Sequence, residues 1–465
     1  MKAFMFSIFH RRSTGIARVW FNSSKPMERS ACMLGVSWRW IAIILLSSAV
    51  SVPAQEALQN MVAGQTAASD RNTQMTSQNQ DYTLKKGDFR LLVVPSLGLQ
   101  WNDNINLART NVLDDYIVTP TVGITASYPF SQNNLLYLDF TVGYNWYLKH
   151  SQFSSFDLNS SSGTGLSFDF VIKDFTINLH DWINYTQGAG QNAVTAGSAS
   201  ATVANTANYG TFQNTLGLLG TWDLNQVTLS LGYDHQNVMS TSGQFDEINH
   251  SAEMLNAQAG FQVHPQITVG LQATAAFTAY DKALLNNNNA YTVGPYVEFR
   301  PGKAFTVTAR GGYSYYQFLN TSTNIQTPSQ NGWYASLAIS HQPFDILSYT
   351  LEVGREVQLG TVSDLVEDWY VRPNATWKII KDVDINTYFF YEHGNQGEGS
   401  TGSLPGVSDL NGTFDWYGGG AGFQYAFSRR FSLGVNYQIT RRSSDAADGS
   451  YIQNLVSLQL SYHPK

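Results

Sequence analysis

Residues 135–148 read LLYLDFTVGYNWYL, and every even-numbered position is apolar or aromatic, from Leu136 through Phe140 to Leu148. Polar or small residues such as Asp139 and Gly143 stand between them. A period of two places alternate side chains on opposite faces of a β-strand. A helical period would instead place Leu136, Asp139, Phe140 and Gly143 on one face. The stretch is therefore expected to form a long strand with one apolar face.

The same alternation recurs along most of the chain. It is clearest in five further segments, at residues 89–101, 267–279, 291–299, 431–439 and 456–462. These runs are longer and more regular than the strands of about 5–6 residues that are usual in soluble proteins. They predict long antiparallel strands and argue against a soluble sandwich or a propeller.

The composition supports strands that cross a membrane. Charged residues make up 13% of the 465 residues, about half of the roughly 25% of an ordinary globular chain, and aromatic residues also make up 13%. Hydrophobic residues are only 43%, and they are spread singly rather than gathered into helical spans. A transmembrane β-barrel distributes its apolar residues in this way.

Short links alternate with long ones. Eight links are short and rich in turn residues: Pro129–Asn134, Ile172–Asp174, Asp223–Gln226, His264–Gln266, Arg300–Lys303, His341–Asp345, Ile379–Asp382 and Ser428–Arg430. Longer polar segments at 186–208, 317–331 and 393–412 lie between them. The alternation is typical of the periplasmic turns and extracellular loops of bacterial barrels. It predicts an all-β, up-and-down antiparallel barrel of about 18 strands, within 16–20.

Aromatic residues near the segment ends share the apolar phase, as the interfacial girdles of a barrel do. They are Trp101, Tyr116, Tyr128, Trp146, Phe175, Trp222, Tyr291, Phe305, Trp333, Trp377, Phe427, Phe431 and Tyr462.

The N-terminus predicts export. A short apolar run, Trp40–Val50, precedes a small-residue cleavage site before Gln55, so residues 1–54 are expected to be a signal peptide. Its n-region is long, and Met27 or Met33 would start a normal one. Residues 55–87 are expected to be a disordered periplasmic leader or, alternatively, a plug of the lumen, and 88–465 the barrel.

Export also bears on partners. Residues 1–54 hold seven of the 27 Lys and Arg and one of the 34 acidic residues, so cleavage leaves a net charge of −13. An acidic exported protein is a poor nucleic-acid binder. The only cysteine, Cys32, would be removed with the signal, which excludes disulfides and a cysteine nucleophile in the mature chain.

The phase opposite the apolar one is expected to line a lumen that, with about 18 strands, is wide enough for water. The predicted pore-lining residues are Asp139, Asp169, Trp182, Asp234, Tyr280, Tyr296, Glu298, Arg310, Tyr334, Glu352 and Tyr388. Acidic groups there would favour cations, and aromatic faces could pass sugar rings. The alternative is that these side chains only pair with one another or with water. The segment 186–208 is the candidate for an inward constriction.

Motifs for chemistry are weak. Residues 397–402 match G-x-G-x-x-G, but the following Ser403-Leu404-Pro405 does not begin the helix that dinucleotide binding needs. His180 with Asp181, and Asp234 with His235, cannot form dyads, because neighbours on a strand point to opposite faces. A triad assembled from different strands stays open, but the expectation is that the protein is not an enzyme and has no cofactor.

Acidic groups could also hold Ca²⁺ through their oxygen atoms. The candidates are Asp114-Asp115, Asp246-Glu247, Asp364 with Glu367-Asp368, and Asp445 with Asp448. None has EF-hand spacing, so solvated charge is the preferred interpretation and no metal site is predicted.

The first hairpin resembles a known family. Residues 90–105, RLLVVPSLGLQWNDNI, followed by Asp115–Pro120, resemble the opening of a family of bacterial outer-membrane β-barrel porins whose first strand ends in an Asp-Asn turn. Some of its members are associated with exopolysaccharide production. The resemblance implies a barrel in the outer membrane of a Gram-negative bacterium and supplies no catalytic residues.

Together these features predict a passive channel for hydrated small solutes, with saccharides or cations as candidates. A component of exopolysaccharide export and a closed structural surface barrel are the alternatives. The expected partners are outer-membrane lipid, lipopolysaccharide and the barrel-assembly machinery.

Overall fold

The computed structural model describes residues 82–131, 133–159, 165–187, 210–241, 246, 248–283, 285–322, 327–358, 365–396, 412–445 and 449–464. The chain divides into Met1–Ile43 and Ile44–Lys465, and every described residue belongs to the second unit. The predicted signal peptide, most of the predicted leader, nearly all of 186–208 and the motif at 397–402 lie outside the described residues. Among those described, no helix has the length and apolar character needed to cross a membrane.

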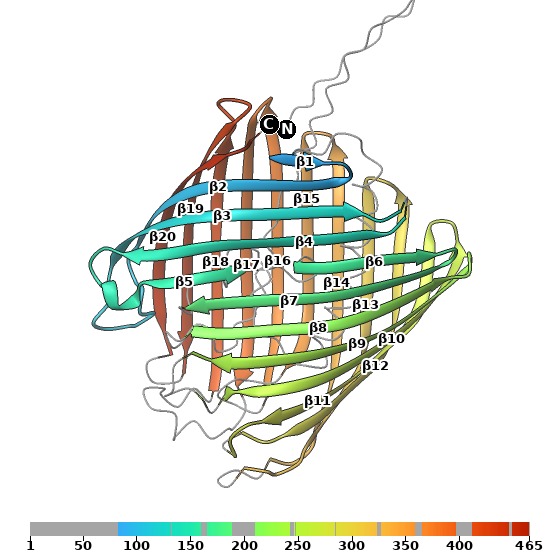
Figure 1. The fold of residues 1–465 in the computed structure, drawn as a ribbon. Coiled ribbons are helices and arrows are strands. Elements are labelled where there is room, and N and C mark those ends of the chain that lie inside the picture. Colours follow the sequence, from blue (N-terminus) through green and yellow to red (C-terminus); the bar gives the residue numbers. More distant parts are fainter. Residues whose placement is uncertain are drawn as a thin grey trace, which may run out of the picture. The chain divides into compact units, whose positions relative to one another are not determined.

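The described residues form one antiparallel sheet of 20 strands and one 3-10 turn. The elements are β1 Leu84–Lys86, β2 Phe89–Asn102, β3 Asp115–Pro129, β4 Leu135–Tyr147, η1 Ser151–Phe153, β5 Ser155–Asn159, β6 Gly165–Ile172, β7 Phe175–Gln187, β8 Gly210–Asp223, β9 Val227–Ser240, β10 His250–His264, β11 Ile267–Tyr280, β12 Asn288–Gly302, β13 Phe305–Phe318, β14 Gln330–Phe344, β15 Leu347–Gln358, β16 Val366–Ile380, β17 Val383–Gln396, β18 Gly412–Tyr425, β19 Phe431–Ser444 and β20 Tyr451–Tyr462. Each strand pairs with its neighbour in sequence except β5 and β6, which do not pair with each other, and β20 returns to pair with β2, which closes the sheet (Figure 1).

Eighteen strands span the barrel wall. β5 and β6 are successive parts of one strand, because both pair with β4 on one side and with β7 on the other. β1 is a three-residue strand that pairs only with the start of β2. The closed antiparallel barrel of 18 strands predicted from the sequence is confirmed.

The links also follow the predicted order. The eight predicted turns fall at one end of the barrel, here named the turn end, and the opposite end is named the loop end. Two predicted turns began too early, because β12 continues to Gly302 and β14 to Phe344. Near the end of each strand the register shifts at a bulge, between Phe299 and Gly302 in β12 and between His341 and Phe344 in β14. Pairing with the next strand resumes at Gly302 and at Phe344. β1 was also not expected, since Leu84–Lys86 belongs to the predicted leader.

The two faces of the sheet differ sharply. Leu231, Leu271 and Val293 are 67%, 62% and 56% exposed, although they lie in the middle of long strands. Polar neighbours on the opposite phase, such as Asp234 and Gln272, are 2% exposed. An apolar outer surface with a polar inner face is the arrangement of a barrel in lipid, where the outer side chains contact hydrocarbon.

Aromatic residues border the apolar outer face at both ends. Phe175, Trp222 and Trp377 lie at the turn end, and Trp146 and Trp333 lie at the loop end. Their side chains are between 38% and 57% exposed. Aromatic rings at these two levels match the interfacial girdles predicted from the sequence, and they mark the borders of the hydrocarbon layer.

Replacing an outer side chain with a charge tests the lipid contact. Leu231→Arg places a guanidinium on the outer face of β9, and we expect it to lower the free energy of unfolding in lipid by about 2–4 kcal/mol, the cost of a base near the bilayer midplane. Asn374→Arg, on the inner phase of β16 and exposed there, should cost much less. Equal effects in denaturant titrations of the folded barrels would contradict the assignment of the two faces.

The seam between the first and last spanning strands is short and is reinforced at the loop end. β2 pairs with β20 only over Ser96–Asn102, whereas it pairs with β3 over Arg90–Asn102. The Asp103 carboxylate accepts hydrogen bonds from the backbone N–H and the side-chain amide of Asn454, at 2.6 and 2.7 Å. The Asp-Asn turn of the first hairpin therefore binds the last strand of the barrel.

Removing this carboxylate should weaken the seam. Asp103→Ala deletes two hydrogen bonds to a charged acceptor, so we expect a loss of about 2–4 kcal/mol in the free energy of unfolding. Asp114→Ala, which removes an exposed carboxylate of the same loop paired with Lys149, should cost much less, because surface ion pairs contribute little to stability. Urea titration and the gel shift between folded and heated barrel measure both variants, and an Asp103 variant as stable as the Asp114 variant would refute the role.

Candidate pore lining

Hydrogen bonds that reach across intervening strands identify the concave face. Gln272 of β11 donates through Nε2 to the Tyr334 hydroxyl of β14 at 3.0 Å, although β12 and β13 lie between them. The Tyr388 hydroxyl of β17 donates to Gln438 Oε1 of β19 at 2.7 Å, across β18. Side chains converge only on the inner side of a closed sheet, so this phase faces the lumen.

All the predicted pore-lining residues lie on this phase. Asp169, Trp182, Asp234, Tyr296 and Tyr334 are buried, and Glu352 is exposed. The remaining five are half-buried: Asp139, Tyr280, Glu298, Arg310 and Tyr388. The structure thus places these side chains on the inner wall, and their contact with a permeating solute stays a prediction.

Glycines let several large inner side chains lie flat along the wall. A Cβ added at Gly354 would lie 2.5 Å from the Tyr370 hydroxyl oxygen, and one at Gly420 would lie 2.6 Å from the ring of Tyr388. These rings therefore occupy the space that a side chain at the glycine would fill. Rings that lie over neighbouring strands project less toward the barrel axis than rings that stand upright.

A buried polar network joins β6, β7 and β9. His180 Nε2 lies 2.9 Å from Asp234 Oδ1, and its Nδ1 lies 2.8 Å from Asn178 Oδ1. The Asn178 amide donates to Asp169 Oδ1 at 2.6 Å and to Ser167 Oγ at 2.7 Å. The Trp182 ring stacks on His180 with ring centroids 4.3 Å apart.

The contact of His180 with Asp234 was not predicted from the sequence, whereas the rejected pairs of adjacent residues do point to opposite faces. His180, Gly217 and Asp234 are register partners on three consecutive strands, so His180 and Asp234 meet over the glycine. Because the Asn178 amide donates to two acceptors, its oxygen accepts from His180 Nδ1–H. Both ring nitrogens of His180 are therefore engaged, which leaves no free nitrogen to act as a general base.

Adding a methyl group at Gly217 tests whether His180 and Asp234 need the space over this glycine. A Cβ at Gly217 would lie 2.0 Å from Asp234 Oδ1 and 2.3 Å from His180 Nε2. Gly217→Ala should therefore lower the free energy of unfolding by about 1–3 kcal/mol through overpacking. Gly434→Ala, whose Cβ would meet nothing closer than 3.9 Å, is the matched control.

A double variant shows whether the loss of stability in Gly217→Ala comes from the steric clash or from the lost backbone freedom of glycine. In a His180→Ala background the Gly217→Ala substitution should cost less, because one of the two clashing side chains is gone. An undiminished cost in denaturant titrations would show that the clash is not the reason.

An ionic cluster on the opposite part of the wall was also missed. Arg372 of β16 donates through Nε and Nη2 to Glu392 Oε1 at 3.0 and 2.6 Å, and its Nη2 lies 3.9 Å from Glu356 Oε1. Its guanidinium stacks over Tyr370 at 4.2 Å. The alternation of apolar and polar residues could have placed Arg372, Glu392 and Glu356 on the inner face, as it placed Glu352. Their pairing with one another depends on the strand register, which the alternation does not give.

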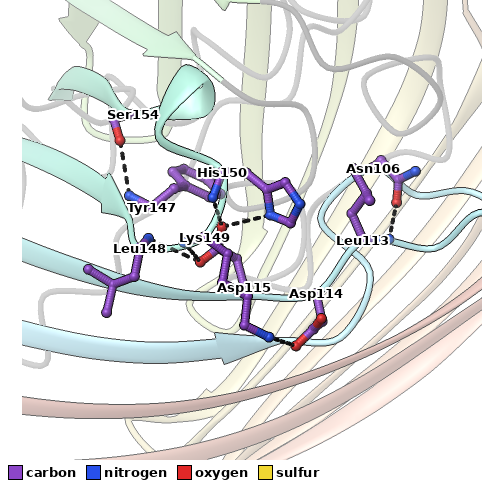
Figure 2. A network of polar contacts seen from close by, with 9 residues as sticks. All are labelled: Asn106, Leu113, Asp114, Asp115, Tyr147, Leu148, Lys149, His150 and Ser154. Atoms are coloured by element: carbon purple, nitrogen blue, oxygen red, sulfur yellow. Dashed lines mark hydrogen bonds and ion pairs between the residues drawn. The ribbon is translucent and has the colours of Figure 1, made fainter.

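Polar contacts fix the loop-end connection between β3 and β4. Asp115 accepts backbone hydrogen bonds from Leu148, Lys149 and His150 at 2.8–3.0 Å, and its carboxylate also contacts the His150 ring (Figure 2). Asp114 pairs with the Lys149 ammonium, which lowers the pKa of the Asp114 carboxyl below its ordinary value. The carboxylates considered for Ca²⁺ are thus bound to N–H groups.

Among the other acidic candidates, Glu367 and Asp368 lie on opposite faces of β16. Glu367 pairs with Arg355 at 2.7 Å on the outer face, whereas the adjacent Asp368 is buried on the inner face. Glu247, Asp364 and Asp448 lie outside the described residues. Within the described part of the chain, no group of three or more His, Cys, Asp or Glu side chains is placed to hold a metal ion.

Known structures that the chain resembles include outer-membrane porins. No protein-family model matches it, and no curated protein is similar in sequence. The Pseudomonas aeruginosa channel OccK2 (OpdF) in complex with glucuronate is 11% identical, with 83% of this chain and 100% of that chain covered and a TM-score of 0.45. A BenF-like porin from Pseudomonas fluorescens Pf-5 is 11% identical, with 81% and 99% covered and a TM-score of 0.44. The outer membrane channel DcaP of Acinetobacter baumannii is 11% identical, with 83% and 100% covered and a TM-score of 0.41.

Proposed function

We propose that the protein is a passive channel for hydrated small solutes in the outer membrane of a Gram-negative bacterium. The observation that carries the proposal is a closed sheet of 18 spanning strands with an apolar outer face and a polar inner face. Barrels of 16–18 strands are wide enough to hold an aqueous channel. Rings that lie flat over glycines, such as Tyr370 and Tyr388, favour an open passage.

The charge of the wall favours cations. Asp139 accepts a hydrogen bond from the neutral Thr125 hydroxyl, and Glu352 and Asp384 have no ion pair within the described residues. Negative charge that no neighbouring base cancels raises the local concentration of cations. The lumen is therefore expected to conduct K⁺ better than Cl⁻.

Transport without covalent chemistry fits the same wall. The His180 ring, which is buried on the inner face, has both nitrogens engaged by Asn178 and Asp234. A role in exopolysaccharide export remains the alternative that the family resemblance suggests. Inner aromatic faces such as Tyr388 would suit passing sugar rings.

Conductance of the refolded chain 55–465 in a planar bilayer tests the channel. We expect steady current in KCl and a reversal potential that shows cation preference. The double variant Glu352→Gln, Asp384→Asn should lower that preference, because two inner charges are lost, whereas Asp114→Asn at the loop end should change it less. Oligosaccharides added afterwards distinguish the saccharide alternative, which predicts a block that depends on their concentration.

A folded barrel that carries no current would reject the passive channel. Its folding is verified beforehand by the gel shift between unheated and heated samples. A current that prefers Cl⁻, or that the double variant leaves unchanged, would reject the role assigned to the carboxylates.

A further inference from the structure

One inner arginine differs from its neighbours in having no counter-ion. Arg300 pairs with Glu298 at 2.5 Å, and Arg372 pairs with Glu392 at 2.6 Å. Arg310 of β13 makes no ion pair or hydrogen bond to any described residue, and its Nε is buried without an acceptor. The side chain as a whole is only half-buried, so its guanidinium remains accessible from the lumen.

Tyrosines surround this guanidinium. Arg310 is the register partner of Tyr296 on β12 and of Ser336 on β14. The Tyr334 hydroxyl lies over Gly312 of β13, and the Tyr370 hydroxyl lies over Gly354 of β15, the register partner of Ser336. Among titratable groups, Glu298, Tyr296, Tyr334 and Tyr370 are close enough to act on Arg310 electrostatically.

The polar hydrogens of this cluster lack acceptors. The Tyr334 hydroxyl oxygen already accepts from Gln272, which leaves its own hydrogen to donate. The Tyr370 hydroxyl makes no hydrogen bond within the described part of the chain. Arg310 supplies only donors. Glu298, the nearby carboxylate, is engaged by Arg300. A half-buried cation next to unused O–H donors is suited to bind an acceptor that carries negative charge.

We propose that Arg310, with the hydroxyls of Tyr334 and Tyr370, forms a subsite for the carboxylate group of a permeating solute. A guanidinium presents parallel N–H groups that match the two oxygens of a carboxylate. The phenol hydroxyls of Tyr334 on β14 and Tyr370 on β16 add neutral donors. The subsite rests on the proposed channel function and adds to it the chemical group that the lumen retains.

The subsite accounts for selection within an acidic lumen. Carboxylates such as Glu352 repel a free anion over most of the passage. Arg310 is a position, within the described residues, where a solute carboxylate meets a base that no wall carboxylate already occupies. Binding there is expected to be weak and reversible, because a solute that is held too tightly would not leave.

Gluconate and sorbitol test the subsite, because they share a carbon skeleton and differ in the carboxylate. In planar bilayers gluconate should block the wild-type K⁺ current at concentrations where sorbitol does not. Arg310→Gln should weaken the gluconate block about tenfold, and Arg310→Lys less, since the charge remains without the planar fork. Lys378→Gln removes one positive charge from an exposed position on the inner phase of β16, away from Glu298 and Arg310, and should leave the block within about twofold of wild type.

A binding measurement that needs no current separates this proposal from the channel. Gluconate should raise the unfolding temperature of the wild-type barrel in detergent above that in sorbitol, through ligand binding to the folded state. Arg310→Gln should abolish the difference, and Lys378→Gln should keep it. If wild type carries no KCl current, the channel proposal fails, and the unfolding temperature still decides the subsite. Equal effects of gluconate and sorbitol on wild type, or equal losses in the Arg310 and Lys378 variants, would overturn it.

Discussion

The closure of the sheet is the constraint on which the rest of the structure depends. In hydrocarbon every backbone N–H and C=O must be paired within the protein, and a sheet achieves this only when its first and last strands meet. Here β2 and β20 meet over Ser96–Asn102, a shorter ladder than β2 forms with β3. The seam is the position where an open edge would otherwise be exposed.

Two local devices compensate for the short seam, one at each end. At the turn end β1 pairs with Phe89–Leu91, the part of β2 that extends beyond its pairing with β20. At the loop end the side chain of Asp103 binds Asn454 of the last strand. The Asp-Asn turn that carries the family resemblance therefore has a structural role, because it ties the two ends of the barrel together.

Much of this architecture follows from local pattern, whereas the pairings on the wall do not. The period of two in residues 135–148 and the turn residues between segments depend only on neighbours in sequence, so they predict strands, faces and strand number. The contact of His180 with Asp234 depends on the register of three strands and on the glycine between them. The strand registers and the short pairing of β1 produce no periodic pattern in the sequence. They can be read only from the closed sheet.

Some charged side chains of the inner wall are paired with an opposite charge and others are not. This difference decides which of them act on a solute in the lumen. Where Arg372 meets Glu392, the fields of the two groups largely cancel at the distance of a hydrated solute. Glu352 and Arg310 have no such partner within the described residues, so their fields extend into the lumen. A solute therefore responds less to the total of inner charges than to these few positions. Because Arg310 is flanked by Tyr334 and Tyr370, the positive position also offers directed hydrogen bonds, which distinguish a carboxylate from a hydrated halide ion.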